Sequence, residues 1–595
     1  MRLVHGLTVL TVACATALAG AREPDVKLPD IGSSAGSVAS PQELHDYGAA
    51  MLQEMRAYGL VLDDPLLNDY INSIGYRLVA SSDRPDLSFT FFVVRDPEIN
   101  AFAAPGGYVA VNAGLITAMT REDELAGVLG HEISHVQQQH ILRAFESTEK
   151  MSIPIMLAML GVMIASAHRN DDAGTAALMA GTSAMQQHQI NFTRSEEAEA
   201  DRFGIQTMAR AGFDPNAMAG AFQTLQKVMR VNGSDVPEFL INHPVNTKRI
   251  AEAKARAAQL GCPSVPKLPP APSLHASSGP LDLSLPPRRE SEPTVLGPPT
   301  EESAIAASDA ATATIERATP GSGTLPQVTV STCSVRGAEE TYFELMHERV
   351  RVLTADSPSM IRAYYANNLH DDPAFDTTSN RYGYALALTA AGEPAKAANE
   401  LREPLKRQPK SSVLLLALAN AEDQSGAKGD AMKIYEQLYD DFPGNRAITL
   451  SYSDALLAQA DAKSARRALE LLRPLVERYG DDPDLQKSFG RANQLAGDKV
   501  RAAEAYAEAA YLTGHAEDAL NQLKALSKQS DLTYYQRSRI DARITELTPT
   551  VLELRKRRAP GGPDALEQMP SQAPAFSCCR PDVDADVPFV GRRRM

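Results

Sequence analysis

The chain has 595 residues, a formal net charge of −15 and a pI near 5.4. One hydrophobic core does not organise a chain of this length, so we expect several domains. The acidic balance argues against a nucleic-acid-binding protein, which needs a basic face, and the sequence carries no phosphate-binding motif.

Residues 1–21 have the features of a signal peptide. Arg2 gives a short positive start, residues 7 to 13 are mostly apolar, and Ala17-Leu18-Ala19 offers a small-residue cleavage site. A membrane anchor fits less well because the apolar run is short. A lipoprotein attached at Cys14 also fits less well, because Thr11 stands where such a signal prefers Leu. We therefore expect export to a periplasm, where the remaining four cysteines can form disulfides.

Residues 40–260 predict a domain of helices with one small sheet. Helices are expected at 41–58 and 64–80, and β-forming residues predict strands at 87–94 and 108–112. The segment 100–107, which ends in Pro-Gly-Gly, predicts a turn. The strand at 108–112 comes shortly before the helix described next. We expect an extended substrate to pair with its exposed edge, although an ordinary small sheet has the same pattern.

The segment His131-Glu132-Ile133-Ser134-His135 has the pattern of a zinc-binding helix. Two histidines four residues apart lie on one helix face, so both can bind one zinc ion, and Glu132 can act as general base. Thr120 is the expected N-cap, with Asp123 reaching back to it, and apolar residues then recur at helical spacing. The alternative is a polar helix face without a metal.

HExxH supplies two ligands, and the acidic stretch 193–204 is the expected source of a third. Glu197 and Asp201 are one turn apart and face the same way. Glu197 can bind zinc while Asp201 accepts the second ring N–H of a ligand histidine. By spacing alone Glu196 and Glu199 compete with Glu197, and a solvated acidic helix face is the alternative without a metal.

These motifs, together with the segment from Asn100 to Ile116, resemble zinc metallopeptidases of the CaaX-prenyl-protease and HtpX type, peptidase family M48. The segment 63–82 narrows the resemblance to periplasmic members that carry tetratricopeptide repeats. The resemblance implies one zinc ion per chain and selects Glu197 as third ligand. It also places His243 near the metal, as a fourth ligand at rest or as a group that steadies the oxyanion. Arg249 is a second candidate for that oxyanion role.

Two further segments are apolar or rich in proline. Residues 153–167 and 173–185 predict a hydrophobic hairpin over the active site. A membrane-embedded prenyl protease is the alternative, disfavoured because a span needs about twenty apolar residues. Residues 263–332 predict a disordered linker, since eleven prolines fall between Pro263 and Pro299.

Residues 339–547 repeat with a period of 34. Ala397, Ala431 and Ala465 keep this step, as do Gly392 and Gly426, while Gly497 follows after three extra residues. This period is typical of tetratricopeptide repeats, each an antiparallel helix pair, and a stack of such pairs offers a groove for protein partners. The tail, 558–595, predicts disorder.

The expected fold is mainly α: an α+β zincin domain with a small sheet, followed by an α-solenoid. The expected function is that of an exported zinc endopeptidase in outer-membrane protein quality control. Its substrates would be misfolded or stalled envelope proteins, and its repeats would recruit them or the outer-membrane assembly machinery, with peripheral membrane contact left open. The alternative is a chaperone or scaffold whose proteolytic site is silent or secondary.

Overall fold

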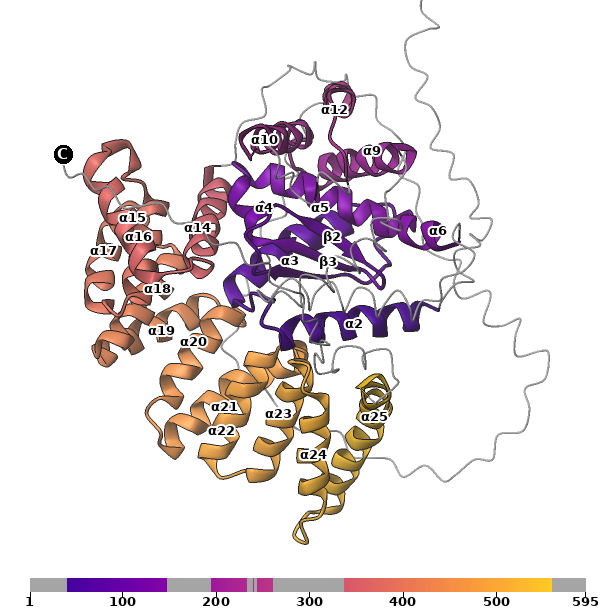
Figure 1. The fold of residues 1–595 in the computed structure, drawn as a ribbon. Helices are drawn as coiled ribbons and strands as arrows, with labels where there is room; N and C mark the ends of the chain where they lie inside the picture. The colour runs from indigo at the N-terminus through magenta and orange to yellow at the C-terminus, as the bar shows by residue number, and fades with distance from the viewer. Residues whose placement is uncertain (1–39, 147–193, 233–238, 240–242, 261–336, 559–595) are drawn as a thin grey trace, which may run out of the picture.

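The computed structural model describes residues 40–146, 194–232, 239, 243–260 and 337–558. The predicted signal peptide, hydrophobic hairpin and linker lie outside these residues, as does the predicted tail beyond residue 558. The described residues form a first region with a small sheet and a second region, an arc of helices beside it (Figure 1). This architecture confirms the mainly α fold.

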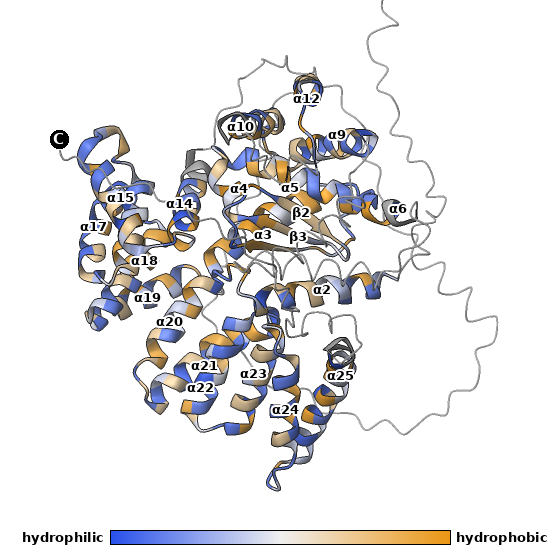
Figure 2. Ribbon diagram, viewed as in Figure 1, coloured by the Kyte–Doolittle hydropathy of each residue, from blue (hydrophilic) through white to orange (hydrophobic). Residues whose placement is uncertain are grey.

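The first region contains one sheet and eight helices among its described residues. In chain order they are α2 (Pro41–Ala57), α3 (Pro65–Ala80), β1 (Thr90–Val94), β2 (Ala101–Ala104), β3 (Tyr108–Asn112), α4 (Ala113–Ala118), α5 (Glu122–Gln137), α6 (His140–Glu146), α9 (Arg194–Ala211), α10 (Ala217–Asn232) and α12 (Thr247–Leu260), with residue 239 also helical. The strands and central helices are largely hydrophobic in Figure 2, because they form the buried core.

The sheet differs from the prediction at its middle segment. Residues 100–107 are a strand plus a turn: β2 pairs antiparallel with β3, and Gly106 and Gly107 make the turn with φ of +83° and +81°. The order is β1-β3-β2, with β1 and β3 parallel. The expectation that residues 108–112 offer a free edge is therefore wrong. The residues of the short, alanine-rich strand β2 have weak β propensity, so the sequence pattern predicts only a turn there.

The helix that carries the HExxH motif also starts one residue away from the predicted position. Helix α5 begins at Glu122 with Arg121 as N-cap. The Glu124 carboxylate accepts the Thr120 N–H at 2.8 Å and its hydroxyl at 2.9 Å. Asp123, expected to reach back, instead accepts the Asp214 N–H at 3.0 Å. The predicted helices at 41–58 and 64–80 are present as α2 and α3, capped by Ser40 and Asp64.

The second region is a run of antiparallel helices. They are α14 (Gly337–Leu353), α15 (Pro358–Asp371), α16 (Thr378–Ala390), α17 (Pro394–Arg407), α18 (Ser412–Ser425), α19 (Lys428–Asp441), α20 (Arg446–Leu457), α21 (Ala462–Arg478), α22 (Pro483–Ala496), α23 (Lys499–Leu512), α24 (Ala516–Ser527) and α25 (Tyr534–Arg558), with a 3-10 turn at Pro373–Phe375. The phased residues Ala397, Ala431 and Ala465 are fully buried, where a small side chain lets neighbouring helices approach closely. The predicted helical repeat region is confirmed.

The two regions pack directly on each other. Arg349 of α14 forms two hydrogen bonds to the Asp64 carboxylate at the start of α3, at 2.8 and 2.6 Å. Arg446 of α20 lies 3.1 Å from Asp69 of α3. The repeat arc therefore runs along α2, α3 and α4, while α9, α10 and α12 lie on the other side of the sheet region (Figure 1).

Candidate metal centre

Four buried side chains converge at the middle of the first region. They are His131, His135, Glu197 and His243, and one ligand atom from each lies within 4.8 Å of the others. The His131 and His135 Nε2 atoms are 3.0 Å apart, and His243 Nδ1 lies 3.3 Å from His131 Nε2. Glu197 Oε1 is 2.8 Å from His243 Nδ1 and 3.4 Å from His135 Nε2.

Three separate elements supply these groups. Helix α5 carries both HExxH histidines on one face, since four residues make about one turn. Helix α9 carries Glu197 in its first turn and packs against α5. His243 stands before α12, and its ring contacts the fully buried Phe239, with centroids 5.0 Å apart.

The cluster fits a zinc ion. Zinc–ligand bonds of 2.0–2.1 Å in a tetrahedron put the ligand atoms about 3.3 Å apart, close to the distances here. Two imidazole nitrogens that face each other across 3.0 Å repel unless a proton or cation lies between them. Three imidazoles and one carboxylate are also the ligand types that zinc prefers.

Asp201 and Arg249 lie behind the ligands. His131 Nδ1 is 3.0 Å from Asp201 Oδ1, as predicted for a carboxylate that orients a ligand histidine. Arg249 donates to both Asp201 oxygens, each at 2.8 Å, and its Nη1 lies 2.6 Å from Glu197 Oε2. Its guanidinium also donates to the Pro244 carbonyl. Arg249 therefore holds two carboxylates in place, and these contacts do not favour the oxyanion role considered from the sequence.

The electrostatics keep the carboxylates ionised. Burial alone would raise the pKa of Glu197, but His131 and hydrogen bonds from His135 and His243 hold this pKa well below its ordinary value. The pKa of Asp201 is lowered in the same way, by His131 and Arg249 against burial. Burial lowers the pKa of His135 well below its usual value, which keeps this ring neutral as a ligand must be.

Glu132 is 1% exposed and points toward the cluster, with Oε1 3.8 Å from His243 Nε2. Burial raises the pKa of Glu132, while the charges of His243 and His131 and the Ala103 backbone N–H of β2 oppose that rise. Oε1 has no hydrogen-bond partner among the described residues. The group therefore has one oxygen held by the sheet and one available for a proton.

His140 is part of the site, although the sequence reasoning missed it. This fully buried side chain has Nδ1 2.9 Å from His135 Nδ1 and Nε2 3.1 Å from Glu199 Oε2. The sequence feature that could have pointed to His140 is its position five residues after His135. Glu199, considered above as a competing ligand, contacts His140, whereas Glu197 lies in the cluster.

Comparison with known proteins agrees with this site. The family model of Peptidase family M48 matches residues 65–257. The putative beta-barrel assembly-enhancing protease of Vibrio cholerae is 43% identical over 253 residues, or 42% of this chain and 52% of that protein. The beta-barrel assembly-enhancing protease of Escherichia coli is 40% identical over 234 residues, or 39% and 47%. The mitochondrial metalloendopeptidase OMA1 of Schizosaccharomyces pombe is 30% identical over 181 residues, or 30% and 50%.

The chain spans about half the length of the curated relatives it matches. Residues 65–257 match the Peptidase family M48 model, and the chain is similar to the beta-barrel assembly-enhancing proteases, which confirms the resemblance drawn from the motifs. Among the described residues no helix is both long and apolar enough to cross a bilayer.

Proposed function

We propose that the chain is an exported zinc-dependent endopeptidase in the quality control of outer-membrane proteins. The observation that carries the proposal is the convergence of His131, His135, Glu197 and His243 beside the Glu132 carboxylate. Likeness to the beta-barrel assembly-enhancing proteases supports the envelope setting, since β-barrels are the spanning proteins of outer membranes.

The roles of the residues follow from their positions. When bound, zinc supplies Lewis acidity and brings the pKa of water near neutrality. Glu132 accepts the proton of the attacking water at the oxygen that has no hydrogen-bond partner among the described residues, and later returns a proton to the leaving amine. Asp201 fixes the ring of His131, and Arg249 fixes both Asp201 and Glu197. His243 either fills the fourth ligand position at rest or steadies the oxyanion.

The substrate is expected along β2 rather than β3. The outer edge of β1 is covered, because Leu62 N–H donates to the Val93 carbonyl at 2.9 Å and Arg95 N–H to the Leu60 carbonyl at 2.7 Å. Among the described segments, none pairs with the outer edge of β2. The Ala103 N–H on this strand faces Glu132, so an extended peptide along β2 would pass the cluster.

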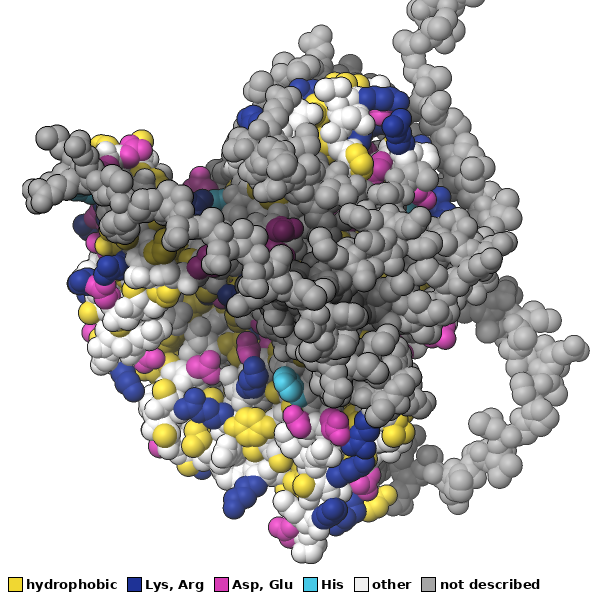
Figure 3. Space-filling model, viewed as in Figure 1, with side chains coloured by type: hydrophobic (Ala, Val, Ile, Leu, Met, Phe, Trp, Pro, Cys, Tyr) yellow, Lys and Arg dark blue, Asp and Glu magenta, His cyan; other side chains and the backbone are white. Residues whose placement is uncertain are grey.

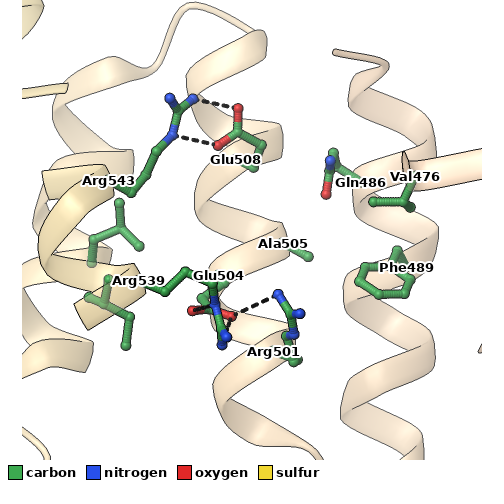
Figure 4. A pocket seen from close by; sticks show the side chains of 11 residues that line it. Val476, Gln486, Phe489, Arg501, Glu504, Ala505, Glu508, Arg539 and Arg543 are labelled. Atoms are coloured by element: carbon green, nitrogen blue, oxygen red, sulfur yellow. Dashed lines mark hydrogen bonds and ion pairs between the residues drawn. The ribbon is translucent and has the colours of Figure 1, made fainter. Parts of the chain in front are cut away.

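The repeat region is the expected recruitment module. On the face shown in Figure 3, basic and acidic side chains are interspersed over its helices, together with apolar ones. A pocket of about 230 Å³ lies between α22, α23 and α25. Figure 4 shows Phe489 on one side and the pairs Arg539–Glu504 and Arg543–Glu508 on the other, at 2.8 and 2.6 Å. Apolar and paired polar walls of this kind suit a protein segment.

Casein digestion by the purified mature protein tests the proposal. Wild type is expected to cleave casein in the presence of zinc, while Glu132→Gln keeps its zinc and loses at least about a hundredfold in rate. Phe489→Ala in the repeat pocket should leave the rate of casein cleavage unchanged. The same variant should be less able than wild type to rescue envelope defects. If wild type binds zinc and cleaves no protein, the endopeptidase proposal is wrong.

The second candidate is a chaperone or scaffold whose proteolytic site is silent or secondary. The extent of the helical repeat region favours it, since such arrays are binding modules. Rescue of envelope defects by Glu132→Gln as well as by wild type would favour this function over proteolysis.

A further inference from the structure

A buried histidine that has no role in the proposed reaction, His140, lies shortly after the HExxH motif. His140 is fully buried, and both of its ring nitrogens are engaged. Nδ1 faces the Nδ1 of His135 at 2.9 Å, and Nε2 faces the Glu199 carboxylate at 3.1 Å. The rings of His135 and His140 meet edge to face, with centroids 4.8 Å apart.

The contact between His135 and His140 requires an interruption of the helix. On a continuous helix, residues five apart point about 140° away from each other, so His140 would leave the face of His135. Instead α5 ends at Gln137, Gln139 adopts a left-handed φ of +56°, and α6 starts at His140. Few residues other than glycine adopt this conformation. This interruption of the helix lets the His140 ring contact the ring of His135.

The hydrogen positions then follow from the ligand role of His135. If Nε2 of His135 gives its lone pair to zinc, its Nδ1 carries the proton and donates to His140 Nδ1. His140 Nδ1 must then be an acceptor, so its Nε2 carries a proton and donates to Glu199. Arg143 lies 3.4 Å from the same Glu199 oxygen and stabilises its charge. Each hydrogen bond in the series has one allowed direction.

We propose that His140, backed by Glu199, is a positioning residue that sets the tautomer and orientation of the zinc ligand His135. The proposal rests on the zinc site of the proposed function. It also gives each of three carboxylates on α9 a separate role, with Glu197 in the cluster, Asp201 on His131, and Glu199 on His135 through His140. Both HExxH histidines are thereby oriented from α9, one directly and one through a second ring.

Zinc affinity of the full chain, measured by competition with a chromogenic chelator, tests this inference without relying on activity. His140→Ala is expected to weaken zinc binding about 10–100-fold, the usual effect of losing such a partner. His140→Asn, whose side-chain oxygen can stand in for Nδ1 as acceptor, should recover part of the loss. Glu199→Ala should weaken binding, and Glu199→Gln, which keeps an acceptor, should lie within about threefold of wild type.

Cobalt substitution provides a second readout. The visible spectrum of the Co²⁺ protein is expected to change in His140→Ala and Glu199→Ala, because the ligand ring turns. Glu252→Ala is the matched control, since this carboxylate lies on α12 and pairs with Lys248 near the surface. Unfolding of the metal-free proteins checks folding. If His140→Ala fails to fold, the partly exposed Glu199 carries the test.

The outcomes separate the inference from the proposed function. If wild type binds no zinc, the proposed function fails. Wild-type zinc binding with unchanged affinity and cobalt spectrum in both alanine variants would overturn the role of His140. A loss in His140→Ala alone, with Glu199→Ala unchanged, would overturn the link to Glu199.

Discussion

Arg249 shows how one side chain organises the candidate site. Its guanidinium joins Glu197 to Asp201, stacks over Phe222 at 4.7 Å, and is itself buried. The planar fork of donors contacts two carboxylates at once in a fixed geometry, which a lysine ammonium does not provide. The pKa of Arg249 is raised, because those two carboxylates outweigh its burial.

Arg249→Ala is therefore expected to lower zinc affinity about 10–100-fold, since Glu197 and Asp201 lose the group that fixes them. Arg249→Lys should recover only part of this loss. Lys248→Ala is the control, because the neighbouring Lys248 side chain is 82% exposed. Chelator competition measures the affinities, and equal values for Arg249→Ala and Lys248→Ala would refute the positioning role.

The sequence predicted the residues with fixed spacing on a single helix. His131, Glu132 and His135 share α5, while Glu197 and Asp201 share α9, and helical periodicity alone places each set on one face. His140 was missed because its contact depends on the left-handed Gln139, which periodicity does not reveal. The approach of His243 to Glu197 depends on packing between distant segments.

At the scale of elements, the sequence predicted where helices form and which residues cap them, but it did not predict how the strands pair. Asp64 and Ser40 cap their helices as residues of this type should. The place of β3 between β1 and β2 depends on contacts across the sheet, so the local pattern suggested the wrong edge. The start of α5 differs by one residue because Glu124, rather than Asp123, reaches Thr120.

The repeat turns give an element-scale prediction. Gly392 and Gly426 adopt φ of +79° and +92°, and the next phased position holds Ala460 at +56°. An L-residue in this conformation costs roughly 1–2 kcal/mol, so Ala460→Gly should stabilise the protein by about 1 kcal/mol. Gly426→Ala should destabilise the protein by a similar amount, because alanine disfavours this positive φ. Apart from the neighbouring residues of the chain, the added methyl group would meet no atom within 4 Å, so no clash adds to this cost. Urea unfolding measures both, and a destabilised Ala460→Gly would contradict this account.

At the scale of the molecule, charged side chains fix the repeat arc to the region that contains the candidate metal centre. Arg349 binds Asp64 with two hydrogen bonds and also donates to the Tyr382 hydroxyl at 3.0 Å. Burial alone would raise the pKa of Asp64, but Arg349 holds this pKa below its ordinary value. The direct packing of the two regions was not predictable, because the proline-rich sequence between them suggested only a tether.

Arg349→Met is expected to destabilise the protein by about 3 kcal/mol at neutral pH, because the Asp64 carboxylate stays buried without its partner. The lowered pKa means that the pair stabilises the fold above the unfolded pKa of about 3.9, and that this stability is lost as pH falls through the folded pKa. In the variant, burial raises the pKa of the unpaired Asp64, so the difference from wild type should begin to shrink above about pH 3.9 and should shrink further below it, as the wild-type pair is lost. Unfolding by urea at several pH values measures it, and Lys396→Met, an exposed substitution, is the control. A pH-independent difference would argue against an electrostatic anchor.

The most direct test of the central claim is the zinc content of the purified mature protein, measured for wild type, Glu197→Ala and Glu196→Ala. We predict one equivalent of zinc in wild type and Glu196→Ala, and a loss of zinc only in Glu197→Ala. Absence of zinc from wild type after addition of the metal, or equal zinc in all three proteins, would contradict the proposed centre.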